Sequence, residues 1–264
     1  MYVLLRNLWL YRGFIRSSIQ REFEAKYRNS LLGGLWTVIH PAAMVLIYTV
    51  IFSQVMHARL PGVENSFSYS IYLCAGVLTW NYFSEVVMRA QNVFLEHGNL
   101  IKKLSFPRLC LPVIVLGSAT LNFLIIFTLF LLFLQVTGNF PGLVIVAIIP
   151  VLIIQVLFAI GLGITLGVLN VFFRDIGQFF GIVMQFWFWL TPIVYATSTL
   201  PTSVRGKIAF NPMTPLVNAY QDILVQQKWP SFSSLWGVGL LALLLCGLGF
   251  RMFRRHVGEM VDEL

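Results

Sequence analysis

Residues 21–41 read REFEAKYRNSLLGGLWTVIHP, and this segment decides how the whole chain is interpreted. Its first part is dense in charged side chains and ends at Arg28, whereas apolar and small residues dominate from there past Pro41. A basic stretch that runs directly into an apolar one is typical of a membrane-surface element that leads into a spanning helix. We therefore expect a first membrane span to begin near the middle of this segment.

The rest of the sequence has the composition of a membrane protein. Of its 264 residues, 58% are hydrophobic and only 11% are charged, whereas soluble domains typically carry about 25% charged residues. Apolar runs of roughly 18 or more residues mark membrane spans. Six such runs lie at residues 33–56, 69–92, 110–136, 143–172, 177–197 and 233–252. The sequence thus predicts an all-α polytopic membrane protein with six transmembrane helices.

The distribution of positive charge predicts the topology. With six spans both termini lie on one side of the membrane, and most of the 18 Lys and Arg residues fall in segments on that side. Only Arg59, Arg205, Lys207 and Lys228 fall on the other side, while Arg89 lies inside a span. The positive-inside rule therefore puts both termini in the cytoplasm. Because topology and anionic lipid account for the net charge of +8, no nucleic-acid partner is expected.

The N-terminal segment, residues 1–30, is predicted to be an amphipathic helix in the cytoplasmic interface. Basic residues on its other faces would point toward lipid headgroups. Its apolar stripe consists of Leu4, Leu8, Tyr11, Ile15 and Ile19. The alternative is that the charges are only the ordinary basic flank of a first span.

Span two contains an acid and a base, Glu85 and Arg89, four residues apart. This spacing, with the acid first, favours an ion pair within one helix. Charges at membrane depth are costly and usually face protein or water. The pair therefore either lines a polar path or cytoplasmic gate, or is a structural pair near the inner interface.

Two further segments predict local features on the cytoplasmic side and inside the membrane. Residues 96–106 form a cytoplasmic loop with room for a short helix, over about 95–104, because Pro107 cannot continue one. Such a helix suits docking to a cytoplasmic partner, and an ordinary basic loop is the alternative. Within span four, GLGITLG at 161–167 predicts close helix packing in lipid.

The block 198–226 is expected to form a re-entrant helical hairpin on the outer face. Pro192 breaks or kinks the fifth span just before it. Inside the block, Thr214 and Pro215 fit the cap and first turn of a helix that is too short to span the membrane. The apolar side of that helix consists of Leu216, Tyr220, Ile223 and Leu224.

The sequence lacks the groups that catalysis or cofactor binding would need. It contains no nucleotide-binding loop, nucleophile elbow, CxxC pair or histidine cluster, so no catalytic residue, cofactor or metal is predicted. Glu85 is the only clear acid inside a span, whereas a proton-coupled carrier would ordinarily show more ionisable groups there. If the chain transports against a gradient, we expect its energy to come from a separate protein.

Aromatic residues make up 15% of the chain, and several run deep into spans one and five. A flat aromatic face can stack on the apolar face of a sugar ring, so an aromatic lining suits a threaded glycan. The predicted substrate path consists of Trp36, Tyr48, Phe52, Phe186, Trp187, Trp189 and Tyr195. For any single residue of this set, packing or lipid contact is the alternative.

Five motifs occur in order along nearly the whole chain. They are KYRNSLLGGLWTVIHP (26–41), GVLTWNYFSEVV (76–87), NLIKKLSFPRLCLP (99–112), FFRDIGQFFGIVMQFWFWLTPIVY (172–195) and NPMTPLVNAYQDIL (211–224). Each is weak alone, but together they resemble the type-2 integral membrane (permease) subunits of bacterial ABC transporters, in the branch that exports polysaccharides. Within that branch the chain is most similar to the permeases for O-antigen and lipopolysaccharide.

The resemblance implies an assembly in the bacterial inner (cytoplasmic) membrane. Two copies of the chain would form a channel, and two copies of a separate ATP-binding subunit would hydrolyse ATP below it. The substrate would be a long glycan, O-antigen first, carried on polyprenyl diphosphate from the cytoplasm to the periplasm. Three regions follow: an interface helix (1–30), a transmembrane domain (31–256) and a cytoplasmic tail (257–264).

The resemblance also implies roles for particular residues. Arg28 and Lys26 would attract the diphosphate at the inner mouth, where low dielectric strengthens the attraction. The loop 96–106 would be received by the ATPase through Asn99, Leu100, Ile101, Lys102 and Lys103. The block 198–226 would form the outer gate, with Pro192, Asn211, Pro212 and Tyr220.

Three alternatives stay open. A permease for teichoic acid or capsule fits the same motifs, as does a drug or lipid exporter of the same family. Outside the family, a membrane-bound glycolipid transferase would need paired acids or a base at a membrane surface. Neither Asp175 nor Asp222 has such a partner in the sequence.

Overall fold

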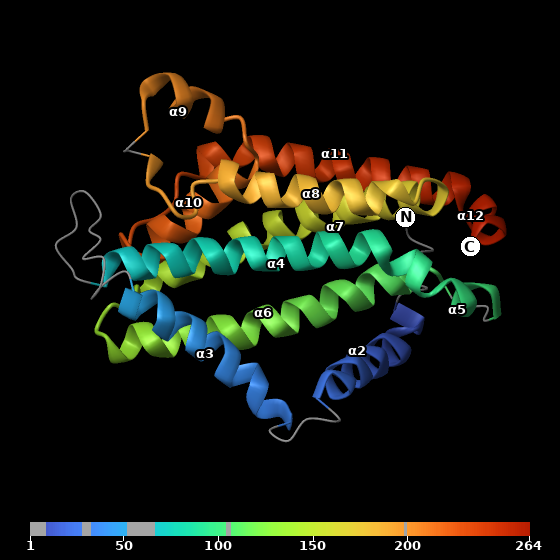
Figure 1. Cartoon of the computed structure of the whole chain (residues 1–264), viewed down its shortest axis with the longest axis horizontal. Coiled ribbons are helices and arrows are strands. Elements are labelled where there is room, and N and C mark those ends of the chain that lie inside the picture. The colour runs from blue at the N-terminus through green and yellow to red at the C-terminus, as the bar shows by residue number, and fades with distance from the viewer. Residues whose placement is uncertain (1–8, 28–32, 52–66, 104–106, 198–199) are drawn as a thin grey trace.

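The computed structural model describes residues 9–27, 33–51, 67–103, 107–197 and 200–264. Every regular element in these ranges is a helix, which confirms the predicted all-α class (Figure 1). The long helices are α3 (Trp36–Thr49), α4 (Ser68–Glu96), α6 (Cys110–Val136), α7 (Ile148–Phe172), α8 (Asp175–Leu190) and α11 (Phe232–His256). The others are α2 (Arg12–Tyr27), α5 (Gly98–Lys103), α9 (Thr202–Ile208), α10 (Met213–Leu224), α12 (Glu259–Glu263) and the 3-10 turns η1 (Gly33–Leu35) and η3 (Gly142–Ala147).

Three helical segments in the described part are long and apolar enough to cross a membrane: Cys110–Val136, Gly142–Phe172 and Phe232–His256. They coincide with three of the predicted spans. Helix α4, of 29 residues, covers a fourth predicted span but carries charged residues. Helices α3 and α8 have 14 and 16 residues, and predicted span 33–56 extends beyond α3 into residues outside the described part.

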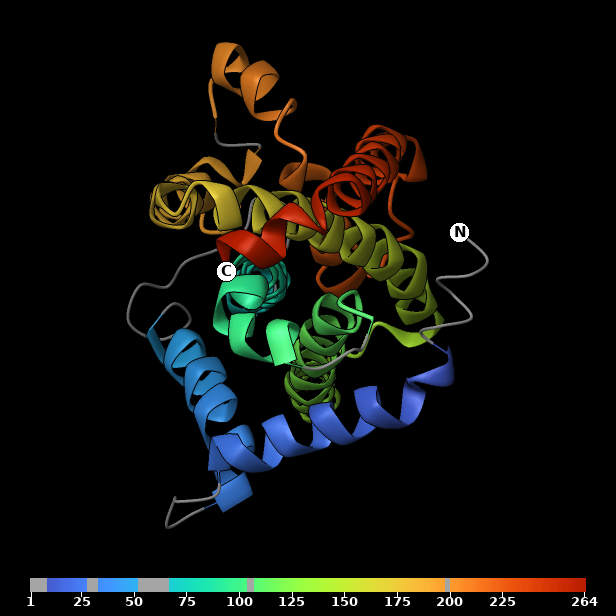
Figure 2. The ribbon, with the colours of Figure 1, turned by 90° about the vertical axis from the view of Figure 1, so that its right-hand side faces the viewer.

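The bundle has two distinct ends. Helices α5 and α12 lie at one end, and α9 and α10 lie at the other (Figure 1). Figure 2 views the bundle from the α5 end and shows α2 running across its side rather than along it. We call these the α5 end and the gate end.

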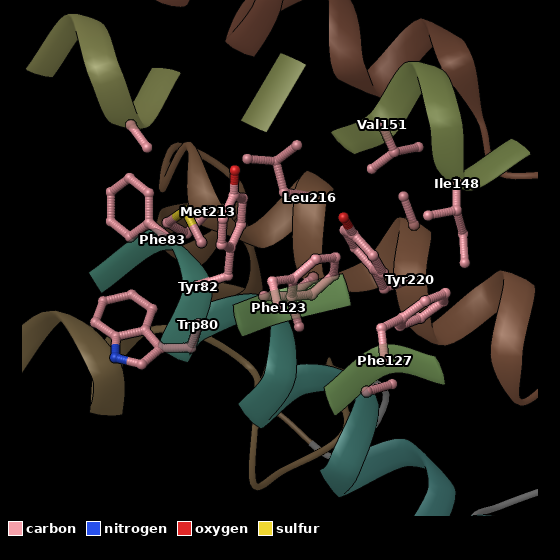
Figure 3. Close-up of a cluster of buried hydrophobic side chains, with 14 of the residues drawn as sticks. Trp80, Tyr82, Phe83, Phe123, Phe127, Ile148, Val151, Met213, Leu216 and Tyr220 are labelled. Carbon is pink, nitrogen blue, oxygen red and sulfur yellow. The ribbon is translucent and has the colours of Figure 1, made fainter. Parts of the chain in front are cut away.

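The core of the bundle is built around α4, which packs against α6, α7 and α10. Aromatic rings fill it: Phe83 stacks on Phe158 with ring centroids 5.2 Å apart, and Tyr82 lies 4.7 Å from Phe123. Helix α10 adds Tyr220 to the same cluster, which Figure 3 shows in close-up. Its predicted apolar residues Leu216, Tyr220, Ile223 and Leu224 are all at most 1% exposed. This short helix is therefore part of the core and not a surface appendage.

Glycines let α7 approach both of its neighbours closely, as the sequence predicts. A β-carbon at Gly161 would lie 2.7 Å from the backbone nitrogen of Cys246 in α11. A β-carbon at Gly163 would lie 2.6 Å from the β-carbon of Ala90 in α4. Because such contacts are too short for real side chains, only glycine permits this spacing of the three helices.

Buried polar side chains join the helices across the core. The amide of Gln155 donates a 2.8 Å hydrogen bond to the carbonyl of Thr79, linking α7 to α4. Asn170 donates to the carbonyl of Gln91 at 3.1 Å and accepts from the backbone N–H of Gly177 at 2.9 Å. The second set fixes where α8 begins relative to α4 and α7, which positions the aromatic residues of α8.

Candidate functional site

A polar cluster joins α2 to the bundle. Arg89 of α4 forms an ion pair with Glu22 of α2, and its Nη1 lies 3.5 Å from Oε1 of Glu85. Ser118 Oγ donates to Glu22 Oε2 at 2.5 Å, and Asn122 Nδ2 donates to Glu85 Oε2 at 3.0 Å. Two carboxylates thus share one guanidinium, and α6 supplies a neutral donor to each.

Apolar contact supports the same junction. Ile19 of α2 sits over Gly117 of α6, where a β-carbon would lie only 2.4 Å from Ile19 Cδ1. The face of α2 that carries Ile15, Ile19 and Glu22 is therefore turned toward α6, while Arg12, Arg16 and Arg21 are exposed. In the described part of the chain, Ile19, the Glu22–Arg89 ion pair and the Ser118–Glu22 hydrogen bond hold α2 to the bundle. The exposed Arg16 and Arg21 of α2 can meet an anionic surface.

At the α5 end, the predicted coupling residues divide into exposed and buried positions. Asn99 and Lys102 are exposed, Leu100 is half-buried and Ile101 is only 5% exposed. The helix they form begins at Gly98 and follows α4 after a break at His97, whose carbonyl accepts the N–H groups of Leu100 and Ile101. A partner that docks here would contact Asn99 and Lys102 but not Ile101.

The C-terminal helix α12 packs directly against α5. Met260 is 3% exposed and joins the same buried cluster as Ile101. A β-carbon at Gly98 would lie 3.4 Å from Leu264 Cβ, and Arg108 donates a 2.6 Å hydrogen bond to the carbonyl of Val257. The segment predicted as a tail therefore packs against α5 and supports its buried side.

The predicted path aromatics occupy two kinds of environment. Trp36 on α3 and Phe186 and Trp189 on α8 are exposed, at 45%, 66% and 65%. Trp187 instead turns inward, with its ring 5.4 Å from Phe83. The first three can meet a substrate, a second copy or lipid, whereas Trp187 is part of the packing between α8 and α4.

Asn211 is the hydrogen-bonding centre of the gate end. Its Oδ1 accepts from Trp187 Nε1 at 2.7 Å and from the backbone N–H of Met213 at 3.0 Å. Its Nδ2 donates to the carbonyl of Leu190 at 3.2 Å and to Thr191 Oγ1 at 3.0 Å. One side chain thus satisfies the end of α8 and the start of α10 together.

The helix cap predicted at Thr214 is wrong. Thr214 lies inside the first turn of α10, and its hydroxyl donates to the carbonyl of Ile208 at 3.0 Å. The side chain that reaches the first turn is Asn211. Asn211 lies one position before Pro212, the residue at the N-cap position, so Thr214 and Pro215 pointed to a position too far along the helix.

The other gate residues lie around the end of α8. Pro192 and Tyr220 are buried, and Pro212 is half-buried. The hydroxyl of Tyr72 in α4 lies 3.2 Å from the carbonyl of Pro192 and donates at 3.0 Å to that of Tyr195. The segment after α8 is therefore tied to α4 as well as to α10.

Several predicted site residues lie outside the described part of the chain. These are Phe52 and Arg28, together with the side chains of Tyr48, Lys26 and Lys103. Among the described residues no group of three or more His, Cys, Asp or Glu side chains could hold a metal ion.

Sequence reasoning missed Glu22, Ser118 and Asn122 as partners of the pair in α4. A signal was present for Glu22, because it follows Ile15 and Ile19 on one helical face. An acid on an otherwise apolar stripe needs a partner. For Ser118 and Asn122, spaced four residues apart in an apolar helix, the same argument applies.

Comparisons with known proteins all find similarity to transport proteins. A family model described as "ABC-2 type transporter" matches residues 14–225. The O-antigen export system permease protein RfbA of Myxococcus xanthus is 30% identical over 266 residues, covering 100% of both chains. A protein of the same name from Klebsiella pneumoniae is 31% identical over 206 residues, 78% of this chain and 77% of its own. The polysialic acid transport protein KpsM of Escherichia coli is 18% identical over 244 residues, 92% and 93% of the two chains.

Proposed function

The chain belongs to the ABC-2 type transporter family, and from this premise we propose that it is the membrane subunit of an ATP-driven polysaccharide exporter. Its substrate is a lipid-linked glycan, with O-antigen on polyprenyl diphosphate as the expected case. The observation that carries the proposal is the match over the whole chain to an O-antigen export permease.

The two ends of the bundle support an orientation across the bacterial inner membrane. The α5 end carries Lys102, Arg108 and Arg174, and α11 ends there with Arg251, Arg254 and Arg255. Arg205, Lys207 and Lys228 lie on or near the gate block. Under the positive-inside rule, the α5 end faces the cytoplasm and six spans cross the membrane, with α3, α4 and α8 adding to the three most apolar.

The exposed surface of α5 is the proposed contact with a separate ATP-binding subunit. Asn99 and Lys102 offer a hydrogen-bonding side chain and a positive charge, while Ile101 and α12 hold the helix in place. ATP hydrolysis then belongs to the partner, present in two copies. The interface helix α2 lies against the side of the bundle (Figure 2). Lys26 and Arg28 are the residues proposed to attract the carrier diphosphate.

A second copy of the chain completes the channel. Phe186 and Trp189 of α8 and Trp36 of α3 present broad exposed aromatic faces. Such faces can stack on the apolar faces of successive sugar rings without selecting one hydroxyl pattern. Trp187 does not join this lining, and its role is to fix α8 against α4.

Export of a capsular polysaccharide is the second candidate, favoured by the match to the polysialic acid transport protein. A drug or lipid exporter of the family, or a glycolipid transferase, is an outcome that experiments can recognise. For a transferase the described spans offer Glu85, whose carboxylate is already engaged by Arg89 and Asn122.

Deletion and affinity capture together test the proposal. Deleting the chain should remove polysaccharide from the cell surface. The glycan should then accumulate inside the cell, still linked to its carrier lipid. Capture of the tagged chain in mild detergent should recover an ATP-binding subunit in equal amount, with the glycolipid identified by mass spectrometry.

A strain complemented with the wild-type chain is the control, and its surface polysaccharide should return. Unchanged surface polysaccharide after deletion would contradict the export role. A chain recovered alone that still processes a glycolipid would indicate the transferase.

A further inference from the structure

A cavity of about 620 Å³ lies at the gate end, between α10, the start of α11 and the segment after α8. These elements meet at one end of the bundle (Figure 1). Small-molecule sites typically enclose about 300–1,000 Å³, so this cavity is large enough for one or two sugar units. Most of the residues that line it belong to the block 198–226 that was predicted as the outer gate, but the described lining holds none of the individually named path and gate residues.

Helix α10 makes the cavity polar because it is amphipathic. Thr214, Asn218, Gln221 and Asp222 recur at helical spacing on the face that lines the cavity. The opposite face is packed into the core, where the predicted apolar residues are almost fully buried. Polar side chains gathered on the face of a helix that lines a cavity need water or a ligand as hydrogen-bond partners.

Several of these polar groups keep free hydrogen-bonding capacity. Within the described part of the chain, the Asn218 side chain makes no hydrogen bond, which leaves two donors and an acceptor toward the cavity. Asp222 accepts one bond, from Gln226 Nε2 at 3.1 Å, through Oδ1. Burial raises the pKa of the Asp222 carboxyl, and the nearby Lys228 opposes the rise. A partly desolvated carboxylate gains from a hydroxyl donor supplied by a ligand.

The charge and shape of the lining select one ligand class. Among the described residues, no Lys, Arg or His side chain lines the cavity, so this lining is poorly suited to a phosphate or diphosphate group. Most of its apolar members are small, such as Ala209, Pro215 and Ala219, with Val225 and the ring of Tyr72 as the larger ones, so the described lining offers little apolar surface for a lipid tail. Amides, hydroxyls and one carboxylate beside small apolar surfaces match a neutral polyhydroxylated ligand.

We propose that this cavity binds a sugar unit of the glycan as it leaves the channel. The inference rests on the proposed export function and adds a carbohydrate-binding site to it. A bound sugar would engage Asn218 and Asp222 of α10 and the serines at the start of α11. Occupancy on the outer side would hinder backward slipping of the glycan between strokes of ATP hydrolysis.

Saturation-transfer NMR on the full chain in lipid nanodiscs tests the site. The probes are D-mannose, D-galactose, L-rhamnose and N-acetyl-D-glucosamine, with choline as a cationic probe and empty nanodiscs as background. We expect transfer to at least one sugar. Because Asn218→Ala removes hydrogen bonds to that sugar, we expect its binding to weaken by about fivefold.

A matched pair of variants distinguishes the effect of filling the cavity from the effect of adding a large side chain elsewhere on the same helix. Ser234 lines the cavity, whereas the neighbouring Ser233 does not. Ser234→Trp should abolish the sugar signal and Ser233→Trp should keep it. If Asn218→Ala does not elute as the wild type does on size exclusion, Asp222→Asn replaces it. This variant removes the carboxylate that would accept from the sugar and changes the shape of the side chain little.

Two results would overturn the site. One is the absence of a sugar signal from the wild-type chain, or a sugar signal that is equally strong in Ser234→Trp and Ser233→Trp. The other is transfer to choline and to none of the sugars. Surface polysaccharide is measured in parallel in the deletion strain and in the strain complemented with the wild-type chain. If deletion leaves it unchanged, the proposed function fails, whereas normal export with no variant-sensitive sugar signal removes the sugar site alone.

Discussion

At the scale of single residues, Asn211 shows how much one side chain can determine. Its amide serves four groups from two helices, and one of them is the partly buried indole of Trp187. A donor left without a partner in such a place costs about 1–3 kcal/mol. The gate end therefore depends on a side chain that contributes little apolar area.

Asn211→Ala is predicted to lower the free energy of unfolding by about 1–3 kcal/mol, because Trp187 Nε1 and the start of α10 lose their acceptor. Reversible unfolding in mixed micelles measures the change. Asn211→Asp, which keeps the acceptor oxygens, should lose less. Equal stability of the wild type and Asn211→Ala would show that solvent replaces these bonds.

The ion pair between Glu22 and Arg89 gives a second prediction. Glu22→Gln should loosen α2 from the bundle, seen as faster hydrogen exchange in α2. Because both side chains are partly exposed, a double-mutant cycle with Arg89→Gln should give a coupling energy of only about 0.5–1 kcal/mol. Glu24→Gln is the matched control, since Glu24 bonds only Gln20 of its own helix in the described part. The same exchange in both variants would contradict the anchoring role.

At the scale of elements, α5 and α12 act as one unit. The buried side of α5 faces Met260 and Leu264, so its exposed side is held at a defined angle to the bundle. A six-residue helix has little stability of its own, and packing must supply it. Coupling to a partner should therefore be sensitive to the C-terminal helix although α12 need not touch the partner.

Met260→Gln is predicted to undock α12 by burying an unpaired amide, at a cost of about 1–3 kcal/mol. Export per ATP hydrolysed should fall while the spans stay inserted, as measured by glycan transfer and phosphate release in the reconstituted complex. Glu259→Gln places the same residue at the adjacent exposed position and should behave as the wild type. Equal coupling ratios for the two variants would exclude the support role.

The close packing of α7 gives a matched test on glycines. Gly161→Leu should push α7 away from α11, because a β-carbon there would meet the backbone of Cys246 at 2.7 Å. Overpacking of this kind costs about 1–3 kcal/mol or more. Gly247→Leu adds the same side chain where nothing lies within 4 Å and should be neutral. Thermal unfolding in detergent measures both, and similar midpoints would mean that the helices can shift freely.

At the scale of the whole molecule, the two ends of the bundle should be reached from opposite sides of the membrane. A membrane-impermeant maleimide on intact spheroplasts should label Ser233→Cys, and Asn99→Cys only after permeabilisation. The wild-type chain is the control, because Cys74 and Cys110 are buried and Cys246 is half-buried. The reverse pattern would invert the proposed orientation.

The sequence by itself determined the class of protein. Long apolar runs, a low charged fraction and five ordered motifs predicted an all-helical membrane protein and its transporter family, both of which are confirmed. These are local properties, since hydropathy and helix periodicity are written in consecutive residues. The glycine-rich string of α7 likewise indicated close packing without naming its neighbours.

Only the tertiary structure decided which residues meet. Glu22 and Arg89 are 67 positions apart, and Trp187 and Asn211 are 24 apart. Whether Ile101 faces a partner or the protein's own C-terminal helix depends on how α12 folds back, which helix periodicity does not encode. Side-chain partners across helices follow from the global packing of the bundle, and so the anchor of α2, the support of α5 and the polar cavity beside α10 emerged only from the folded chain.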